Sequence, residues 1–191
     1  MELREAQLSR REIEEKLKTV GDYVKMDYLN ACLKKPLDFD TRKFVMIKLA
    51  GVYEVRGMFA DAGKLFRAMA EINTTFQGKI NDFVKSGDLF VKEGKFNEGD
   101  LSFGKAMSIS TVNQKAEVRA AMKESYRTQA KIYLAKSQRK HALDTYERLL
   151  SLEFIMPEEK KEVQKIILEL YDKLGKVREA MNLRRSLGMP L

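Results

Sequence analysis

Residues 49–69 read LAGVYEVRGMFADAGKLFRAM, and this stretch decides the fold. On each side of Gly57 a small residue precedes an aromatic one; the pairs are Ala50 with Tyr53 and Ala62 with Phe66. Apolar residues recur at spacings of three and four on both sides of the glycine, which is the pattern of amphipathic helices. The stretch therefore predicts two helices joined by a glycine turn, a helical hairpin.

The same pattern recurs along the chain. The matching positions are Gly87, Phe90, Gly94, Gly99 and Phe103; Ala130, Tyr133, Ser137, Ala142 and Tyr146; and Leu168, Tyr171, Gly175 and Ala180. A faint first copy surrounds Gly21, and the five turn positions 21, 57, 94, 137 and 175 lie 36, 37, 43 and 38 residues apart. One hairpin cannot cover its own apolar face, so neighbouring hairpins are expected to stack and the end copies to become polar caps. Asn30 and Arg184 replace the second aromatic residue in the end copies, as such caps predict.

Residues that typically begin or end helices occur along the whole chain. Gly21, Gly57, Gly94 and Gly175 each follow a helix-length apolar pattern, where a residue with positive φ ends a helix. Pro157 can open a helix at its first position. No segment alternates with period two over the length of a strand. The sequence thus predicts an all-α fold, an α-solenoid of about five stacked hairpins.

These small–aromatic–small–aromatic positions resemble the tetratricopeptide repeat (TPR) family over nearly the whole chain. The resemblance implies a single TPR-like domain, 1–191, with a right-handed superhelix. Its repeats are expected at about 7–40, 43–78, 80–112, 123–156 and 161–191. Two features depart from the family: the steps exceed its usual length of about 34 residues, and Thr74, Thr111 and Phe154 stand where it often has proline. Longer helices or turns are therefore expected.

Composition excludes several classes of protein. The chain has 191 residues, 44% of them apolar, which is enough for a core and too apolar for a disordered tail. One cysteine excludes a disulfide scaffold and a thiolate zinc site. The longest stretch without a charged residue, 106–114, is too short to span a membrane. With no apolar leader at the start, the expected location is the cytoplasm.

No motif predicts catalysis, a metal site or a cofactor. Residues 99–105 approach the phosphate-binding loop, but Ala106 lacks the required hydroxyl and the segment lies within a predicted helix. His141 is the only histidine and has no partner at ligand spacing, so a surface position is expected. Cys32 is expected to be a small core residue, and Asn73 to lie in a turn that ends a helix. The chain is therefore predicted not to be an enzyme.

The resemblance to the TPR family implies where a ligand would bind. In that family the first helix of each hairpin lines a concave groove. The corresponding candidate ligand-binding residues are Ile47, Val84, Asp88, Val91, Arg127, Lys131, Leu134 and Lys165. The family's carboxylate clamp requires asparagine four residues after a lysine, and neither Lys131 nor Glu169 supplies it. Binding of an acidic chain end by such a clamp is not expected.

A basic ladder with a spacing of four stands out in the second half of the chain; its members are Lys115, Arg119, Lys123, Arg127 and Lys131. The net charge of +8 also concentrates there, with −1 over residues 1–40, +3 over 41–110 and +6 over 111–191. Two interpretations remain open. Acids on neighbouring helices could neutralise the ladder, with Asp88, Glu162, Glu169 and Asp172 as candidates. Alternatively, the ladder faces an anionic partner.

The sequence as a whole favours a non-catalytic scaffold that binds a peptide or helix with apolar anchors and acidic flanks. The alternative is a helical-repeat protein that binds the backbone of RNA or DNA through its basic half. A third hypothesis is a homo-oligomer that uses the groove on itself. No cofactor is expected under any of the three.

Overall fold

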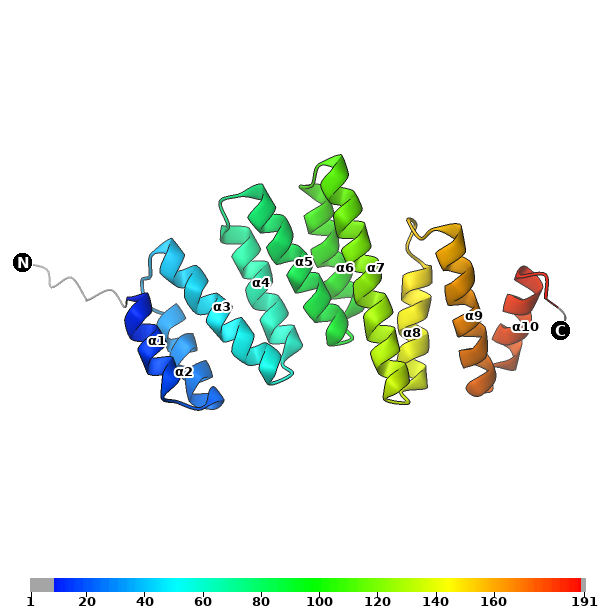
Figure 1. Cartoon of the computed structure of the whole chain (residues 1–191), viewed down its shortest axis with the longest axis horizontal. Coiled ribbons are helices and arrows are strands. Elements are labelled where there is room, and N and C mark those ends of the chain that lie inside the picture. The colour runs from blue at the N-terminus through cyan, green and yellow to red at the C-terminus, as the bar shows by residue number, and fades with distance from the viewer. Residues whose placement is uncertain (1–8, 190–191) are drawn as a thin grey trace, which may run out of the picture. The chain divides into compact units, whose positions relative to one another are not determined.

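The computed structural model describes residues 9–189, and within that range it contains ten helices and no strand (Figure 1). The all-α prediction is confirmed. The helices form five consecutive pairs: α1 (Arg10–Lys18) with α2 (Asp22–Leu33), α3 (Phe39–Val55) with α4 (Phe59–Ile72), α5 (Phe76–Lys92) with α6 (Phe96–Ser108), α7 (Val112–Ala135) with α8 (Arg139–Leu150), and α9 (Pro157–Lys173) with α10 (Val177–Ser186). No helix in residues 9–189 is long and apolar enough to cross a membrane.

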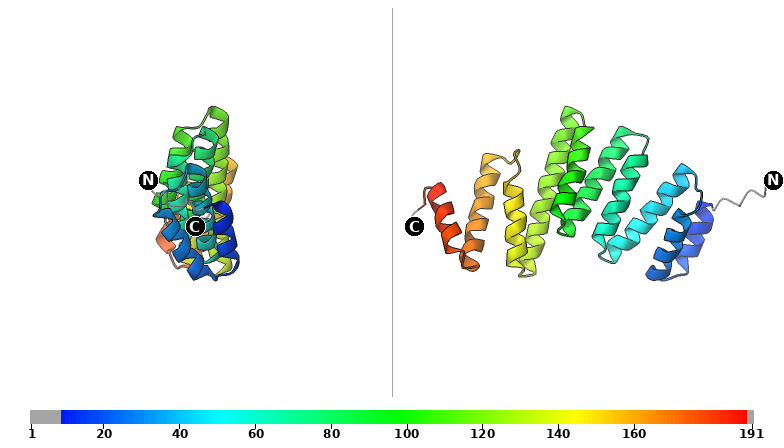
Figure 2. Two further views of the ribbon diagram at one scale, coloured as in Figure 1. Left: turned by 90° about the vertical axis from the view of Figure 1, so that its left-hand side faces the viewer. Right: turned by 180° about the vertical axis from the view of Figure 1, so that it is seen from behind.

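The chain divides into two compact units, residues 1–118 and 119–191, with the boundary inside α7. In the first unit each helix from α2 to α6 packs against the next, as the views from front and back both show (Figures 1 and 2). In the second unit α9 packs against both α8 and α10. The fourth repeat was expected from residue 123, whereas α7 begins at Val112. The single domain and the right-handed superhelix stay predictions.

Four of the five hairpins use the same turn. In each, a residue in the left-handed region follows the first helix, and the next backbone N–H donates to a carbonyl five residues earlier. These bonds are Met58 to Tyr53 (2.8 Å), Lys95 to Phe90 (2.8 Å), Gln138 to Tyr133 (2.8 Å) and Lys176 to Tyr171 (2.9 Å). This is the Schellman arrangement, which satisfies the last carbonyl groups of a helix. Gly57, Gly94 and Gly175 have φ of 72°, 77° and 68°, as their sequence positions predicted.

The other two turn positions are not glycines with a positive φ. Gly21 has φ of −75° and caps the N-terminus of α2, so the prediction of a positive φ there is wrong. The reason is that α1 ends earlier, at Lys18, with Thr19 as its C-cap. Ser137 occupies the left-handed position of the fourth hairpin with φ of 59°. A side chain in this region costs about 1–2 kcal/mol relative to the right-handed one.

Glycines let the helices of the first unit approach one another closely. A Cβ atom added at Gly87 of α5 would lie 2.8 Å from the ring of Phe103 in α6, and one at Gly63 of α4 would lie 3.1 Å from the ring of Phe90. Both phenylalanine rings are buried. Phe90 therefore packs between successive hairpins, whereas Phe103 packs on the first helix of its own hairpin.

Hydroxyl groups bridge the same helices. The Ser86 hydroxyl of α5 donates to the carbonyl of Gly63 in α4 at 2.8 Å, and it lies 3.1 Å from the hydroxyl of Ser102 in α6. Both serines are fully buried. Buried polar groups must be hydrogen-bonded to avoid a desolvation penalty. The close approach of the helices at the glycines brings these hydroxyl and carbonyl groups within hydrogen-bonding distance, so the network depends on it.

The second unit has its own apolar core. Tyr126 and Ala130 of α7 are buried, as are Ala142 and Tyr146 of α8 and Ile167 of α9. Pro157 opens α9, as predicted. α10 is mainly polar, and the guanidinium of Arg184 pairs with Asp172 at 2.8 Å. α10 is therefore the polar end cap that was predicted from Arg184, which stands where other copies have an aromatic residue.

We expect Gly87→Ala to lower the free energy of unfolding by about 1–2 kcal/mol, because its methyl group would press on the Phe103 ring. Gly51→Ala is the matched control, since an added Cβ there has no atom within 4 Å. This control should raise stability by up to about 1 kcal/mol through helix propensity. Urea denaturation measures both changes, and equal effects would contradict the proposed close contact.

We expect Ser137→Gly to raise the free energy of unfolding by about 1 kcal/mol, because glycine adopts the left-handed region without steric cost. Ser151→Gly is the control, because Ser151 is exposed at the C-cap of α8 with a negative φ of −76°. It should gain nothing. Thermal and urea unfolding of the three proteins measure the difference, and stabilisation by both changes would show that the φ of Ser137 is not its cause.

Candidate functional site

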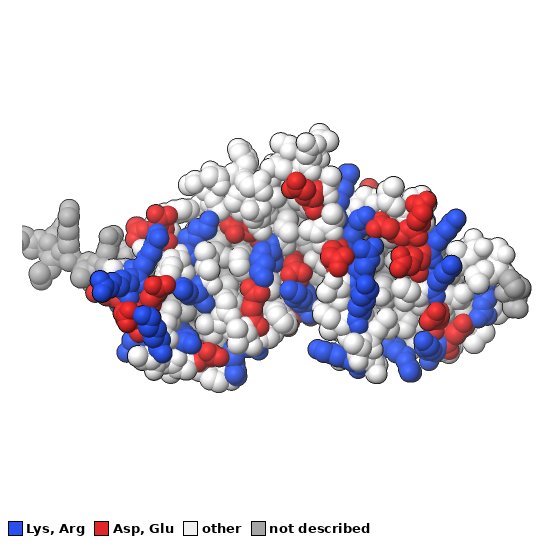
Figure 3. Space-filling view, in the orientation of Figure 1, with Lys and Arg blue, Asp and Glu red and all other residues white. Residues whose placement is uncertain are grey.

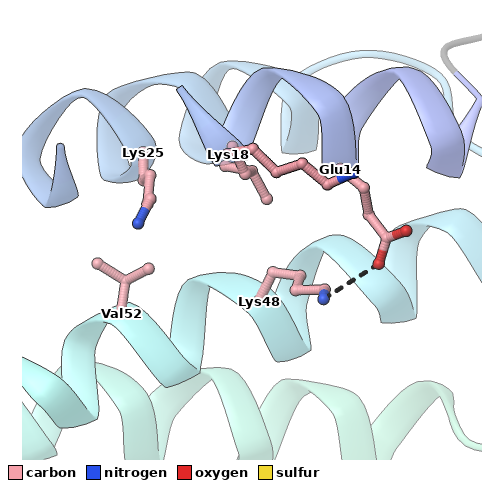
Figure 4. A pocket seen from close by; sticks show the side chains of 6 residues that line it. Glu14, Lys18, Lys25, Lys48 and Val52 are labelled. Carbon is pink, nitrogen blue, oxygen red and sulfur yellow. Dashed lines mark ion pairs between the residues drawn. The ribbon is translucent and has the colours of Figure 1, made fainter. Parts of the chain in front are cut away.

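A surface cavity of about 340 Å³, open to solvent, lies between the first three helices of the first unit. Its lining residues come from α1, α2 and α3; they are Glu14, Leu17, Lys18, Lys25, Lys48 and Val52 (Figure 4). Leu17 and Val52 give it an apolar part, and three lysine side chains surround that part. In Figure 4 the side chains of Lys25 and Val52 face each other across the space.

Each lysine of this cavity has a carboxylate neighbour. Lys48 pairs with Glu14 at 3.2 Å across α3 and α1. Lys18 pairs with Glu15 at 2.7 Å and Lys25 with Asp22 at 3.5 Å, each within its own helix. Ion pairs at a solvent-exposed surface contribute only about 0–1 kcal/mol. An incoming carboxylate can therefore replace these partners at small cost.

The four candidate residues of the first unit differ in their exposure to solvent and in their partners. Ile47 is exposed, Val84 is half-buried, and the carboxylate of Asp88 pairs with Lys92 at 2.8 Å. Val91 is completely buried, so the expectation that it lines an open groove is wrong. Its side chain is needed elsewhere, because it packs where α6 crosses α5 at Gly99.

The four candidate residues of the second unit all lie at least partly at its surface. Lys131 and Lys165 are exposed, whereas Arg127 and Leu134 are half-buried. No ion pair to Lys131 or Lys165 occurs within residues 9–189. Both lysines are thus available to an anionic group, which Arg127 is not.

Glu159, at the start of α9, forms hydrogen bonds with two basic side chains of α7. One carboxylate oxygen accepts from Lys123 Nζ at 2.7 Å, and the other accepts from Arg127 at 3.0 Å. The backbone N–H of Met156 also donates to this carboxylate, at 3.1 Å. Hydrogen bonds from Lys123, Met156 and Arg127 together lower the pKa of Glu159 from 4.5 to about 2. The carboxylate is therefore charged throughout the physiological range.

Neutralisation by acidic neighbours is confirmed for two members of the basic ladder. Figure 3 shows the lysines and arginines of α7 as a band with carboxylates beside it. Lys123 and Arg127 share Glu159, which sequence reasoning did not name. Two acids that it did name are engaged elsewhere: Glu169 pairs with Lys173 at 3.6 Å and Asp172 with Arg184. Arg119 instead lies 5.4 Å from the centre of the Phe154 ring.

Sequence reasoning missed Glu159, Lys48 and Val52. The sequence did contain a signal for Glu159. Proline marks the first position of a helix, and a glutamate two residues later can accept a hydrogen bond from the backbone N–H of the N-cap residue. Lys48 follows the candidate groove residue Ile47 by one position, and one residue turns a helix by 100°, so the cavity lies on a different face of α3 from Ile47. The assignment of Ile47 to a groove stays a prediction.

The remaining sequence motifs have structural roles. The segment that approaches a phosphate-binding loop lies within α6, as predicted, so most of its backbone N–H groups are used in the helix. His141 is exposed, and Cys32 is buried in the core of α1, α2 and α3. The Asn73 side chain donates to Asp82 at 2.9 Å in the turn after α4. No cluster of potential metal ligands occurs among residues 9–189.

No protein-family model matches this chain, and no curated protein matches it in sequence. Among solved structures, the chain is similar to the crystal structure of BtubC (BKLC) from P. vanneervenii. The two share 15% sequence identity over 94% of this chain and 80% of that one, with a TM-score of 0.39. A similarity this low assigns neither a family nor a function.

We expect Glu159→Gln to lower the free energy of unfolding at pH 7 by about 1–2 kcal/mol, allowing for solvent screening of this partly exposed group. The folded-state pKa is lowered, so the stabilisation is complete above pH 4.5 and is lost as the pH falls towards 2. The difference from the wild type should therefore shrink with acidification.

Urea denaturation at a series of pH values measures this difference. Glu158→Gln is the control, because Glu158 is the exposed neighbour of Glu159 and makes no ion pair within residues 9–189. A difference between Glu159→Gln and the wild type that stays constant between pH 7 and pH 3 would contradict the assigned role.

Proposed function

We propose that this chain is a non-catalytic, TPR-like interaction scaffold that binds a peptide segment or helix on the first helices of its hairpins. The observation that carries the proposal is the cavity between α1, α2 and α3, in which three lysines surround Leu17 and Val52. Its volume of about 340 Å³ lies at the lower end of the range of ligand pockets, about 300–1,000 Å³. It therefore suits one or two side chains of a larger partner.

The chemistry of the cavity selects the partner. An apolar side chain fits against Leu17 and Val52, while an adjacent carboxylate replaces Glu14 beside Lys48. Ile47, which is exposed on the same helix, offers a further apolar contact. The preferred ligand is thus a segment in which aspartate or glutamate flanks a leucine or an aromatic residue.

Binding to the backbone of RNA or DNA is the weaker alternative. Affinity for phosphates comes from lysines and arginines that release counterions on binding. In the second unit, Lys123 and Arg127 already share Glu159, which removes the centre of the basic ladder from such use. Of the four candidate residues in that unit, Lys131 and Lys165 are the exposed cations without an ion pair within residues 9–189, and two lysines provide few phosphate contacts.

Selection from a displayed library of random short peptides tests the proposal. We expect the recovered sequences to combine an acidic and an apolar residue and to bind at micromolar affinity. Lys48→Glu should weaken that binding by about tenfold or more, because it places a carboxylate beside Glu14. Lys35→Glu, the same charge reversal at an exposed residue outside the cavity, is the control and should have little effect.

Two results would overturn the proposal. One is the recovery of peptides whose binding responds equally to both charge reversals. The other is tight binding of a single-stranded RNA oligonucleotide whose affinity falls with salt at a logarithmic slope steeper than about −3, which requires several phosphate contacts. Helicity measured by circular dichroism shows that each variant remains folded.

A further inference from the structure

A second cavity lies in the other unit, between α8, α9 and α10, and has a volume of about 570 Å³. Its lining is partly apolar and partly acidic; the residues include Leu150, Ile167, Leu183, Glu147, Glu179 and Tyr171. The Tyr171 hydroxyl donates to Glu147 at 2.7 Å. None of the described lining residues is basic. The cavity is therefore an acidic site with an apolar floor.

The repeat pattern shows what fills the equivalent place in the first unit. Arg67 of α4 lies five residues after the small residue of its helix, and Glu147 of α8 occupies the same position. In the following hairpin, Phe90 of α5 corresponds to Tyr171 of α9, and Glu98 of α6 to Glu179 of α10. The two sites are thus built alike, except that a glutamate replaces the arginine.

Arg67 is held in the first unit by an aromatic ring and a carboxylate. Its guanidinium carbon lies 4.6 Å from the centre of the Phe90 ring. Its Nη1 atom pairs with the Glu98 carboxylate at 2.7 Å, and its Nη2 atom donates to the Glu98 carbonyl at 2.9 Å and to the Ser102 hydroxyl at 3.1 Å. A cation over a ring together with a charge-assisted hydrogen bond is a favourable arrangement for arginine.

In the second unit the ring and the carboxylate remain, but position 147 is a glutamate and no arginine is among the described residues that line the cavity. We propose that this cavity binds the arginine side chain of a partner protein, with Tyr171, Glu179 and Glu147 as its contacts. The guanidinium takes the place that Arg67 occupies in the first unit, and Glu147 adds a second carboxylate. The apolar stem of the arginine packs on Leu183, which replaces the Ser102 hydroxyl.

The electrostatics of the cavity agree with a cationic ligand. Burial raises the pKa of Tyr171, and the hydrogen bond to Glu147 and the negative charge of Glu179 raise it further. The Nζ atom of Lys176 lies 5.6 Å from the centre of this ring, but Lys176 does not line the cavity. A planar guanidinium suits the site better than an ammonium group, because it can stack on the ring and bond to a carboxylate at once.

This site lies in a different unit from the cavity between α1, α2 and α3, so the inference stands independently of the proposed function. Titration with the blocked peptide acetyl-Leu-Arg-Leu-amide, followed by NMR, tests it. We expect the largest shifts at Tyr171, Ile167 and Leu183. The citrulline analogue, which has the same shape without the charge, should bind about tenfold more weakly or not at all.

Variants of the two carboxylates sharpen the test. Glu179→Gln should weaken arginine-peptide binding about tenfold. Glu147→Arg should abolish it, because the new side chain would fill the cavity as Arg67 fills its own site, and the melting temperature should not fall. Glu153→Gln is the control, since Glu153 is an exposed acid in the turn between α8 and α9.

Each opposing result would overturn the inference. These results are shifts away from Tyr171, equal binding of the citrulline or lysine analogue, or loss of binding in Glu153→Gln equal to that in Glu179→Gln. Persistent binding to Glu147→Arg would also contradict it. Circular dichroism of every variant separates loss of the site from loss of the fold.

Discussion

The contact between the ring of Phe103 and Gly87 is the constraint on which the first unit depends. Because a ring atom would lie 2.8 Å from any added Cβ, only glycine allows α5 and α6 to approach this closely. The same approach brings Gly99 close to the Gly87 carbonyl and buries Val91 between the helices. It also brings the hydroxyls of Ser86 and Ser102 within 3.1 Å. The close approach of α5 and α6 therefore accounts both for the apolar packing and for the hydrogen bonding of the buried serines.

Several ion pairs in this chain link neighbouring helices. Glu54 of α3 pairs with Lys85 of α5 at 2.7 Å, and Glu159 of α9 holds two cations of α7. Such pairs link consecutive first helices and fix their register more than they add stability. The ion-pair geometry, rather than the total charge, thus decides which cations can meet a partner.

The hairpins could be predicted from the sequence because small, aromatic and turn residues recur at fixed spacing. That pattern located the turns at Gly57, Gly94 and Gly175 and the serine that replaces glycine at 137. It failed at Gly21, where α1 is too short for the spacing to hold. The periodicity of the sequence thus predicts which helices form more reliably than it predicts where each helix ends.

The candidate sites were less predictable, because a site depends on which face a helix presents. A shift of one residue turns that face by 100°, which separates the predicted groove residue Ile47 from the cavity residue Lys48. Val91 was misplaced for a different reason, since its burial follows from the approach of α6, which the pattern of its own helix does not show. The sequence also contained both acidic and basic side chains near α7 without showing that Glu159 would pair with two of them.

The hydroxyl network and the polar end cap together give the chain an uneven resistance to local opening. Separating any one of α4, α5 and α6 from the others breaks a hydrogen bond of the buried Ser86 or Ser102 hydroxyl, so we expect these three helices to exchange their amide hydrogens cooperatively. In α1 and α10, by contrast, a single residue of each helix is buried, Ile13 and Ala180 respectively. A protease or an unfolding machine that acts on this protein therefore gains access first at α1 or α10.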